Sequence, residues 1–449
     1  MSSDTVRIDN VQPRSRTKRR NAAAAVAADS LTFPLAVWVV HWLLTQVPAT
    51  LAYRYGNFRT TEGFGPESGA YRGILEPLAG VAHWLVEPLR HWDGTWYRLV
   101  AVEGYEQGGS AKAAFWPLYP WLMDLGSTIT GWSPETIGYL ISNAAFLGAL
   151  MVLYRLVAID FDVEVARRAL WALALFPTAL FFTAVYTESL FLLLAVSALY
   201  GARRGDWLMA GILGFFAALT RSSGFMLLAP FAVLFIQQYG WSPRRWFPQA
   251  IPASLPVLGP IIFGWFLRSN GRTFFDFAEQ QWQWNRFSAT PWRTFECTLQ
   301  GCSEDVRQFG NVSRSFPVRP IDWGWPGELL NNLNWSFVTS TEFRYRFGQS
   351  YVLELLITVM AFALVLIGLK KLPFYYTAFA VPPLIVPLLT PSSVIPLMSM
   401  PRFVLPLFPL FVMIAILVRG KKLELPLAVA SSILLVILTM QFAQWYWVS

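Results

Sequence analysis

Residues 31–53 read LTFPLAVWVVHWLLTQVPATLAY, a mostly apolar run of 23 residues without Lys, Arg, Asp or Glu. A helix needs about 20 apolar residues to cross the hydrocarbon core of a bilayer. A basic tail that includes Arg14, Arg16 and Lys18 precedes the run, and basic residues beside a span stay in the cytoplasm. This stretch therefore predicts a first membrane helix with a cytoplasmic tail, residues 1–30.

The composition extends this interpretation to the whole chain. Of 449 residues, 55% are hydrophobic and 14% are charged, with 35 Lys and Arg against 27 Asp and Glu. Soluble globular proteins carry about 25% charged residues, so the composition excludes an ordinary soluble enzyme and a disordered chain. The basic residues lie in short clusters between apolar runs, which is typical of membrane topology and not of a nucleic-acid binder. We predict an all-α, polytopic transmembrane bundle that binds membrane lipids and no nucleic acid.

Further apolar runs predict about eleven spans in total, with every adjacent pair of basic residues on the cytoplasmic side. The run from 168 to 203 is broken by Pro177 and by Tyr186-Thr-Glu-Ser189, which predicts two spans joined by an outer turn. The predicted organisation is a basic cytoplasmic tail (1–30), a transmembrane core with the candidate catalytic residues (31–268, including outer loop 54–134), an outer polar, Trp-rich segment (269–348) and C-terminal transmembrane helices (349–449).

Unusual polar residues all fall on the predicted outer face. An ionisable group at membrane depth costs about 2.5–3.5 kcal/mol on insertion scales, so such groups are usually paired or functional. Their placement on one side predicts a shared polar cavity at the outer leaflet. The candidates are His91, Trp92, Asp93, Tyr186, Glu188, Arg221, Asp276, the Gln280–Arg286 stretch and Arg402.

Asp93 is the strongest candidate for chemistry. Aromatic residues flank it, and Gly94 follows it, which would allow a ligand to come close. A carboxylate in this setting could accept a proton from a hydroxyl group. Alternatively, Asp93 caps a helix that begins at Thr95, because Asp is a preferred N-cap residue. The spacing does not choose between the two.

Three further charged residues each have two interpretations. Glu188 would bind a ligand hydroxyl or an arginine, or it is a hydrated turn residue. The guanidinium forks of Arg221 and Arg402 suit a phosphate, although arginines near helix ends also anchor helices at the interface. Two arginines on the side of Asp93 favour an anionic ligand.

Cys297 and Cys302 both lie in the outer segment, where an oxidising environment favours a small-loop disulfide over two unpaired cysteines. With only three histidines, the sequence shows no ligand cluster for zinc. No acidic cluster has a clear metal-ligand pattern, but Asp93 with Glu103 or Glu188 could hold one divalent ion.

Several motifs carry a family resemblance. In chain order they are His91-Trp-Asp-Gly-Thr-Trp-Tyr97, Phe115-Trp-Pro-Leu-Tyr-Pro120, Tyr186-Thr-Glu-Ser189, Leu219-Thr-Arg-Ser-Ser-Gly224 and Pro401-Arg-Phe403. Together they resemble the PIG-V family of GPI mannosyltransferases, which is similar to other GT-C glycosyltransferases. The glycine after His91-Trp-Asp and the basic N-terminal tail resemble a prokaryotic relative.

The resemblance implies a GT-C-like fold with a catalytic acid in the first outer loop. It implies transfer of a hexose, mannose in this family, with inversion, from a polyprenyl- or dolichyl-phosphate donor to a lipid-linked or glycan acceptor. The reaction would take place at the outer face of a prokaryotic plasma membrane, or at the lumenal face of the endoplasmic reticulum membrane in a eukaryote. Such a donor needs no nucleotide-binding glycine loop, and the sequence shows none.

The resemblance also suggests roles for single residues. Asp93 matches the family's acid and would be the general base, while Tyr186 and Glu188 match its YTES-like turn and would line the sugar site. Charge alone assigns Arg221 and Arg402 to the leaving phosphate. The alternative function is a transporter or flippase of a lipid-linked sugar, which the placement on one face disfavours. The remaining substrate-binding candidates are His91, Trp92, Glu103 and Gln280.

Overall fold

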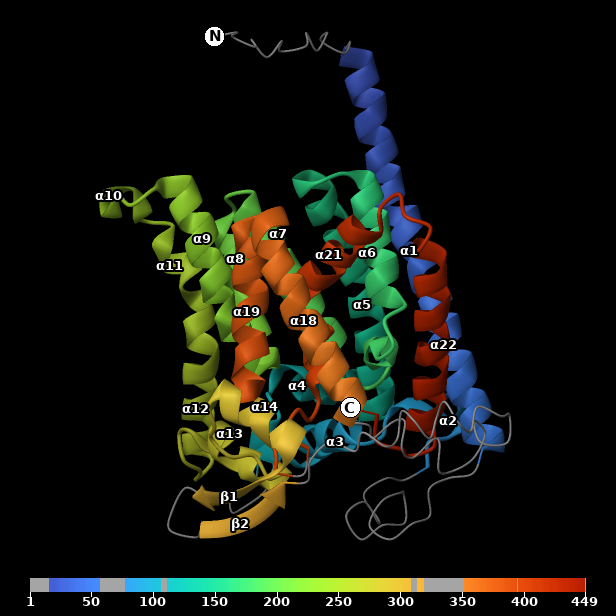
Figure 1. Cartoon of the computed structure of the whole chain (residues 1–449), viewed down its shortest axis with the longest axis vertical. Coiled ribbons are helices and arrows are strands. Elements are labelled where there is room, and N and C mark those ends of the chain that lie inside the picture. Colours follow the sequence, from blue (N-terminus) through green and yellow to red (C-terminus); the bar gives the residue numbers. More distant parts are fainter. Residues whose placement is uncertain are drawn as a thin grey trace.

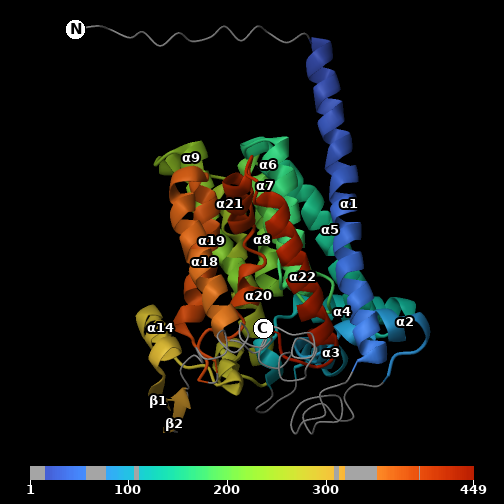
Figure 2. The ribbon, with the colours of Figure 1, turned by 45° about the vertical axis from the view of Figure 1, so that its right-hand side comes forward.

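A computed structural model of the chain describes residues 16–56, 77–105, 111–307, 313–318, 351–393 and 395–448. The long helices run roughly side by side in a bundle (Figures 1 and 2). The first helix begins beyond one end of the bundle and the last helix ends at the other. We call the first the inner end and the second the outer end, following the predicted topology.

Within the described residues, six helical segments are long and apolar enough to cross a membrane, so the chain is a multi-pass membrane protein. Four of them lie in single helices: Asp29–Tyr55 in α1 (Arg16–Tyr55), the whole of α5 (Pro134–Asp160), Val352–Lys371 in α18 (Tyr351–Lys371) and the whole of α22 (Glu424–Ala443). The other two consist of consecutive shorter helices. Ser222–Tyr239 combines η4 (Ser222–Leu227) with α9 (Leu228–Tyr239), and Ala250–Ser269 combines α11 (Ala250–Ala253), η5 (Leu255–Val257) and α12 (Leu258–Ser269). Shorter apolar helices are α8 (Trp207–Thr220), α19 (Phe374–Leu389) and α21 (Phe408–Val418). The predicted transmembrane bundle is confirmed, and the count of about eleven spans stays a prediction.

Helix starts at the two ends are encoded locally. The side chain of Ser133 accepts a hydrogen bond from the Thr136 N–H and begins α5, with Pro134 in its first turn. Asp162 begins α6 (Val163–Ala174) in the same way, and Asp206 begins α8. Short polar side chains at these positions bind backbone N–H groups that have no partner inside the helix.

The long apolar run from 168 to 203 is interrupted where the sequence predicts. Helix α6 ends at Ala174, a short 3-10 helix η3 (Ala179–Phe182) follows, and α7 (Glu188–Arg203) begins at the predicted turn. The turn is not hydrated, however, because Thr187 and Glu188 are fully buried. Helix α7 is buried on nearly all sides, so the carboxylate at its start lies inside the protein.

The predicted outer loop and outer segment meet at the outer end (Figure 1). The loop contains α2 (Gly80–Leu85), η1 (Glu87–Leu89), α3 (Asp93–Glu103), η2 (Ala111–Ala114) and α4 (Leu118–Thr130). The segment contains α13 (Asp276–Glu279), η6 (Gln280–Trp284), α14 (Pro291–Gln300) and an antiparallel hairpin of β1 (Cys302–Arg307) and β2 (Ser313–Val318). The hairpin is a small departure from the all-α prediction.

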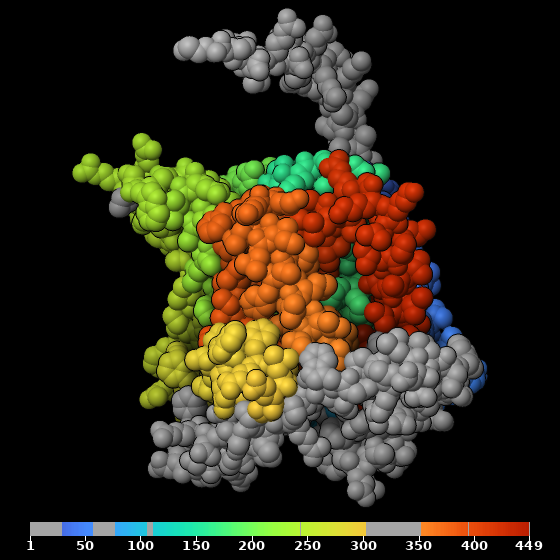
Figure 3. Space-filling view, in the orientation of Figure 1, coloured from blue at the N-terminus to red at the C-terminus, as the bar shows by residue number. Residues whose placement is uncertain are grey.

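Two short helices complete the described elements. Helix α10 (Pro243–Trp246) lies at the inner end, and α20 (Met400–Val404) precedes α21. On the face seen in Figure 3, α18 and α22 leave a recess through which side chains of the bundle interior are visible. The helices are therefore not uniformly packed around the centre.

Candidate functional site

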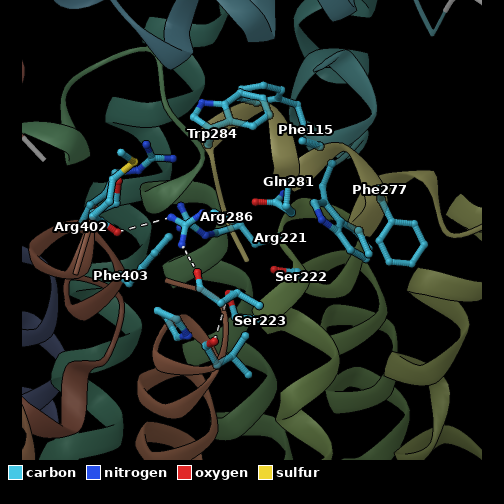
Figure 4. Close-up of a pocket in the computed structure, with 18 of the residues that line it drawn as sticks. Phe115, Arg221, Ser222, Ser223, Phe277, Gln281, Trp284, Arg286, Arg402 and Phe403 are labelled. Atoms are coloured by element: carbon cyan, nitrogen blue, oxygen red, sulfur yellow. Dashed lines mark hydrogen bonds between the residues drawn. The ribbon is translucent and has the colours of Figure 1, made fainter. Parts of the chain in front are cut away.

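A cavity of about 520 Å³ lies where α3, η4, η6, α19 and α20 meet. Figure 4 shows arginines from three separate parts of the chain at this cavity. Part of its wall is aromatic, because Phe115 and Trp284 pack with ring centroids 5.6 Å apart. The charged residues that line it are Asp93, Arg221, Glu279, Arg286 and Arg402.

A charged network forms one side of the cavity. Nη1 of Arg402 donates to Oδ2 of Asp93 at 2.5 Å, and Nε of Arg402 donates to Oε1 of Glu188 at 2.5 Å. Nη1 of Arg221 reaches the same Oε1 at 2.5 Å and the Thr187 hydroxyl at 3.1 Å. The structure thus brings together Asp93, Glu188, Arg221 and Arg402, as the sequence predicts. Glu188 lies behind the two arginines instead of on the cavity wall.

Asp93 itself lies at the start of α3. The helix begins at Asp93 and not at Thr95, and the Asp93 carboxylate binds Arg402 instead of capping the helix. Its side chain is 14% exposed and lines the cavity. No described residue donates a hydrogen bond to Oδ1, so this oxygen is available to a ligand. A Cβ atom at Gly94 would lie 3.4 Å from the Val185 carbonyl, and Gly94 is not among the residues that line the cavity, so the expected close approach of a ligand at Gly94 stays a prediction.

The backbone before Asp93 has an unusual conformation. Trp92 has a φ of 57°, which a bulky side chain rarely adopts. The Tyr186 hydroxyl donates to the His91 carbonyl at 3.1 Å and accepts from the Asp93 N–H at 3.2 Å. These two bonds flank Trp92 and hold its conformation. Tyr186 is 1% exposed and does not line the cavity, so its position supports Asp93 and does not fit the expected sugar contact.

His91 and Trp92 pack against the C-terminal residues. The His91 ring stacks on Trp445 with centroids 4.1 Å apart, and its Nδ1 lies 3.1 Å from the Phe442 carbonyl. Burial lowers the pKa of His91 to about 3, against the raising effect of this hydrogen bond. The imidazole is therefore neutral at pH 7, with its proton on Nδ1. Trp92 packs edge-on against Trp447, which lines the cavity.

Two predicted substrate-binding residues lie elsewhere. Glu103 ends α3, ten positions after Asp93, and pairs with Lys112. Gln280 is buried and donates to Asp276 at 2.8 Å, while its neighbour Gln281 lines the cavity. Neither prediction fits these positions. Gln280 and Gln281 are adjacent, and the sequence alone could not tell which side chain faces the cavity.

The suggested divalent-ion sites do not fit the arrangement of these residues. Within the described part of the chain, no group of three or more His, Cys, Asp or Glu residues could hold a metal. Glu103 is at the far end of α3 from Asp93, and the guanidinium of Arg402 bridges Asp93 to Glu188. This guanidinium already supplies the positive charge between the two carboxylates.

Arg286 also lines the cavity, although nothing in the sequence marks this residue by itself. Its Nη1 donates to the Thr390 carbonyl at 2.8 Å and its Nη2 to the Met398 carbonyl at 3.4 Å. Burial lowers its pKa to about 10, so the guanidinium remains charged at pH 7. In the sequence Arg286 is only the end of the polar Gln280–Arg286 stretch, and nothing local shows that this stretch lies beside α19.

Glu354 is a second residue that the sequence analysis missed. It lies in α18, and its two carboxylate oxygens accept the N–H groups of Ser399 at 3.2 Å and Met400 at 3.1 Å. Ser399 has a φ of 67° and begins α20, which carries Arg402. The carboxylate therefore holds the turn that positions Arg402. An acidic residue inside an apolar span was a signal that could have found it.

Cys297 is fully buried and disulfide-bonded. The side chain of Cys302, the predicted partner, lies outside the described part of the structure. The pairing of Cys297 with Cys302 stays a prediction.

A family model described as Mannosyltransferase (PIG-V) matches residues 74–242. A search of curated proteins found no match. The structure is similar to a crystal structure of ArnT from Cupriavidus metallidurans bound to undecaprenyl phosphate, with a TM-score of 0.46 and 12% identity over 93% of this chain. The chain covers 63% of the ArnT chain. The predicted resemblance to the PIG-V mannosyltransferase family is confirmed over residues 74–242, the part of the chain that contributes Asp93, Glu188 and Arg221.

Proposed function

We propose that this protein is an inverting membrane glycosyltransferase. It transfers a hexose, mannose in the matched family, from a polyprenyl- or dolichyl-phosphate donor to a lipid-linked or glycan acceptor at the outer face of the membrane. The observation that supports this function best is the Asp93 carboxylate, which faces a cavity lined by three guanidinium groups. A base beside several cations suits a reaction in which a hydroxyl group attacks and a phosphate leaves.

Asp93 would act as the general base. The acceptor oxygen forms a bond to the anomeric carbon while the bond from that carbon to the phosphate oxygen breaks. The hydroxyl proton passes to Asp93, and the bonding electron pair leaves with the phosphate. Attack opposite the leaving group inverts the anomeric configuration. Arg402 orients the carboxylate through Oδ2, which leaves Oδ1 for the acceptor hydroxyl.

The arginines would stabilise the leaving phosphate. Arg221 and Arg402 are held by Glu188, so their guanidinium groups are fixed before the substrate binds. Fixed cations lower the energy of a developing negative charge without reorganising during the reaction. The aromatic wall of Phe115 and Trp284 offers a surface on which a sugar ring could pack.

The test uses the full chain in lipid nanodiscs with radiolabelled undecaprenyl-phosphate-mannose and membrane lipid extracts as acceptors. We expect labelled product, with an anomeric configuration by NMR opposite to that of the donor. Asp93→Asn should lower kcat by about 100- to 10,000-fold, the contribution of a general base. Asp124→Asn is the matched control, because Asp124 lies exposed on α4 at the same end. If Asp93→Asn transferred sugar at the native rate, Asp93 would not be the general base. A product that retained the donor's anomeric configuration would exclude the inverting mechanism.

A further inference from the structure

We propose that Arg286 binds the phosphate of the lipid donor and that the polyprenyl chain leaves the cavity along α19. This inference rests on the proposed function and assigns the donor's position within the same cavity. It adds Arg286 to Arg221 and Arg402, the two arginines that charge alone assigns to the leaving phosphate.

The three arginines at the cavity differ in their charge balance. Arg402 is paired with both Asp93 and Glu188, and Arg221 is paired with Glu188. Among the described residues, no carboxylate forms an ion pair with Arg286. Arg286 is half-buried, and a guanidinium group partly removed from water without a counter-ion is costly, so an incoming anion would lower that cost. Arg286 therefore gains most from an anionic ligand.

The guanidinium group of Arg286 is also placed to bind a phosphate. The carbonyls of Thr390 and Met398 fix two of its five N–H groups, and no described residue accepts from the other three. The Phe403 ring lies 5.7 Å away. Figure 4 shows Arg286 beside Arg221 and above Phe403, with its two hydrogen bonds marked. The group is thus held in place with donors left for phosphate oxygens.

The cavity wall beside Arg286 favours a lipid over a free phosphate. Thr390 is the C-cap of α19, and the preceding turn of α19 contributes Val386 and Pro387 to the cavity wall. Val386 is 37% exposed, so this wall continues to the protein surface. Met226 of η4 also lines the cavity. These apolar side chains would contact a hydrocarbon chain that leaves the phosphate.

The binding experiment measures the affinity of the nanodisc-bound full chain for undecaprenyl phosphate, undecaprenol and inorganic phosphate. Thermal shift gives both the ligand-free Tm and the ligand-induced change. Arg286→Gln should weaken undecaprenyl phosphate binding by about 10- to 100-fold, the usual range for hydrogen bonds to a charged group, and Arg286→Lys should weaken it less. Arg293→Gln is the matched control, because Arg293 is on α14 in the same segment, paired with Glu296 at the surface.

The outcomes separate this proposal from its alternatives. Unchanged lipid binding by Arg286→Gln overturns it, even if the ligand-free Tm falls, because Arg286 would then only tether the outer segment to α19. Equal binding of undecaprenol by the native chain also overturns it, since the phosphate would not contribute. If inorganic phosphate binds as tightly as undecaprenyl phosphate, the predicted path of the polyprenyl chain along α19 is overturned. A native chain that binds undecaprenyl phosphate through Arg286 but transfers no sugar supports this proposal and contradicts the proposed function.

A cross-linking experiment tests the path directly. The photoreactive residue p-benzoylphenylalanine, introduced at position 386 of α19, should cross-link to undecaprenyl phosphate. Position 433 of α22 is the control, because Ile433 is 54% exposed on a helix away from α19 (Figure 1). Equal cross-linking at both positions would contradict the path along α19.

Discussion

Nη1 of Arg402 donates a hydrogen bond of 2.5 Å to Oδ2 of Asp93, and the two residues are 309 positions apart in the chain. The same arginine reaches Glu188 through Nε at 2.5 Å. One guanidinium group on the short helix α20 therefore joins the first outer loop to the start of the central helix α7. Its planar fork makes both contacts at once, which a lysine could not do.

Arg402→Lys should therefore lower kcat more than it raises the donor KM. The ammonium group keeps the charge but cannot hold both carboxylates in one geometry, and a misplaced base slows proton transfer. We expect a loss of kcat of about 100-fold, within the range for one oriented catalytic group. Steady-state kinetics in nanodiscs measure both parameters. Arg268→Lys, an exposed change on α12, should leave them at native values. Native kcat in Arg402→Lys would show that the bridge has no part in catalysis.

Glu354→Gln should impair activity without touching the substrate. A carboxamide oxygen can accept one of the Ser399 and Met400 N–H groups, but its NH2 group cannot accept the other. The turn before Arg402 should loosen, so we expect about a 10-fold lower kcat, equivalent to the loss of one buried hydrogen bond. The conservative variant Glu354→Asp should recover part of this loss. Glu296→Gln at the surface of α14 serves as the control, and an unchanged kcat in Glu354→Gln would contradict the positioning role.

Tyr186→Phe removes only the hydroxyl group that binds the His91 carbonyl and the Asp93 N–H. The Trp92 conformation then loses both flanking hydrogen bonds, and an unsatisfied buried backbone group costs about 1–3 kcal/mol. We expect a lower Tm and a lower kcat with little change in donor affinity, because the hydroxyl does not line the cavity. Tyr200→Phe near the other end of α7 provides the comparison. If the variant lost donor affinity but kept the native kcat, Tyr186 would contact the sugar instead of supporting the backbone.

The pKa of His91 predicts how stability changes with pH. Burial lowers its folded-state pKa to about 3, whereas an unfolded histidine titrates near 6.5. Only the unfolded chain binds a proton between these values, so stability is complete above pH 6.5 and falls as the pH decreases toward 3. At pH 5 the expected loss from this residue is about 2 kcal/mol. Tm measured in nanodiscs at pH 7.5 and 5.0 should fall less in His91→Gln than in the native chain. An equal fall in both proteins would contradict a neutral, buried His91.

Much of the helix layout follows from the sequence because its signals are local. Ser133, Asp162 and Asp206 begin helices at the ends of apolar runs, and Pro177 follows the end of α6. An N-cap depends on residues three positions away, and a span depends on about 20 consecutive apolar residues. The hairpin of β1 and β2 was missed, because a short polar strand pair has no comparable signal.

The sequence by itself determined that this chain crosses a membrane and that Asp93, Glu188, Arg221 and Arg402 are exceptional, because charge within apolar surroundings is visible in a linear sequence. Only the tertiary structure decided that Tyr186 supports the backbone, that Gln281 and not Gln280 faces the cavity, and that Glu354 and Arg286 belong to the site. Each of these facts depends on which side chain points inward and on contacts between helices far apart in the chain. Such contacts follow from packing of the whole bundle, and no local pattern of residues specifies them.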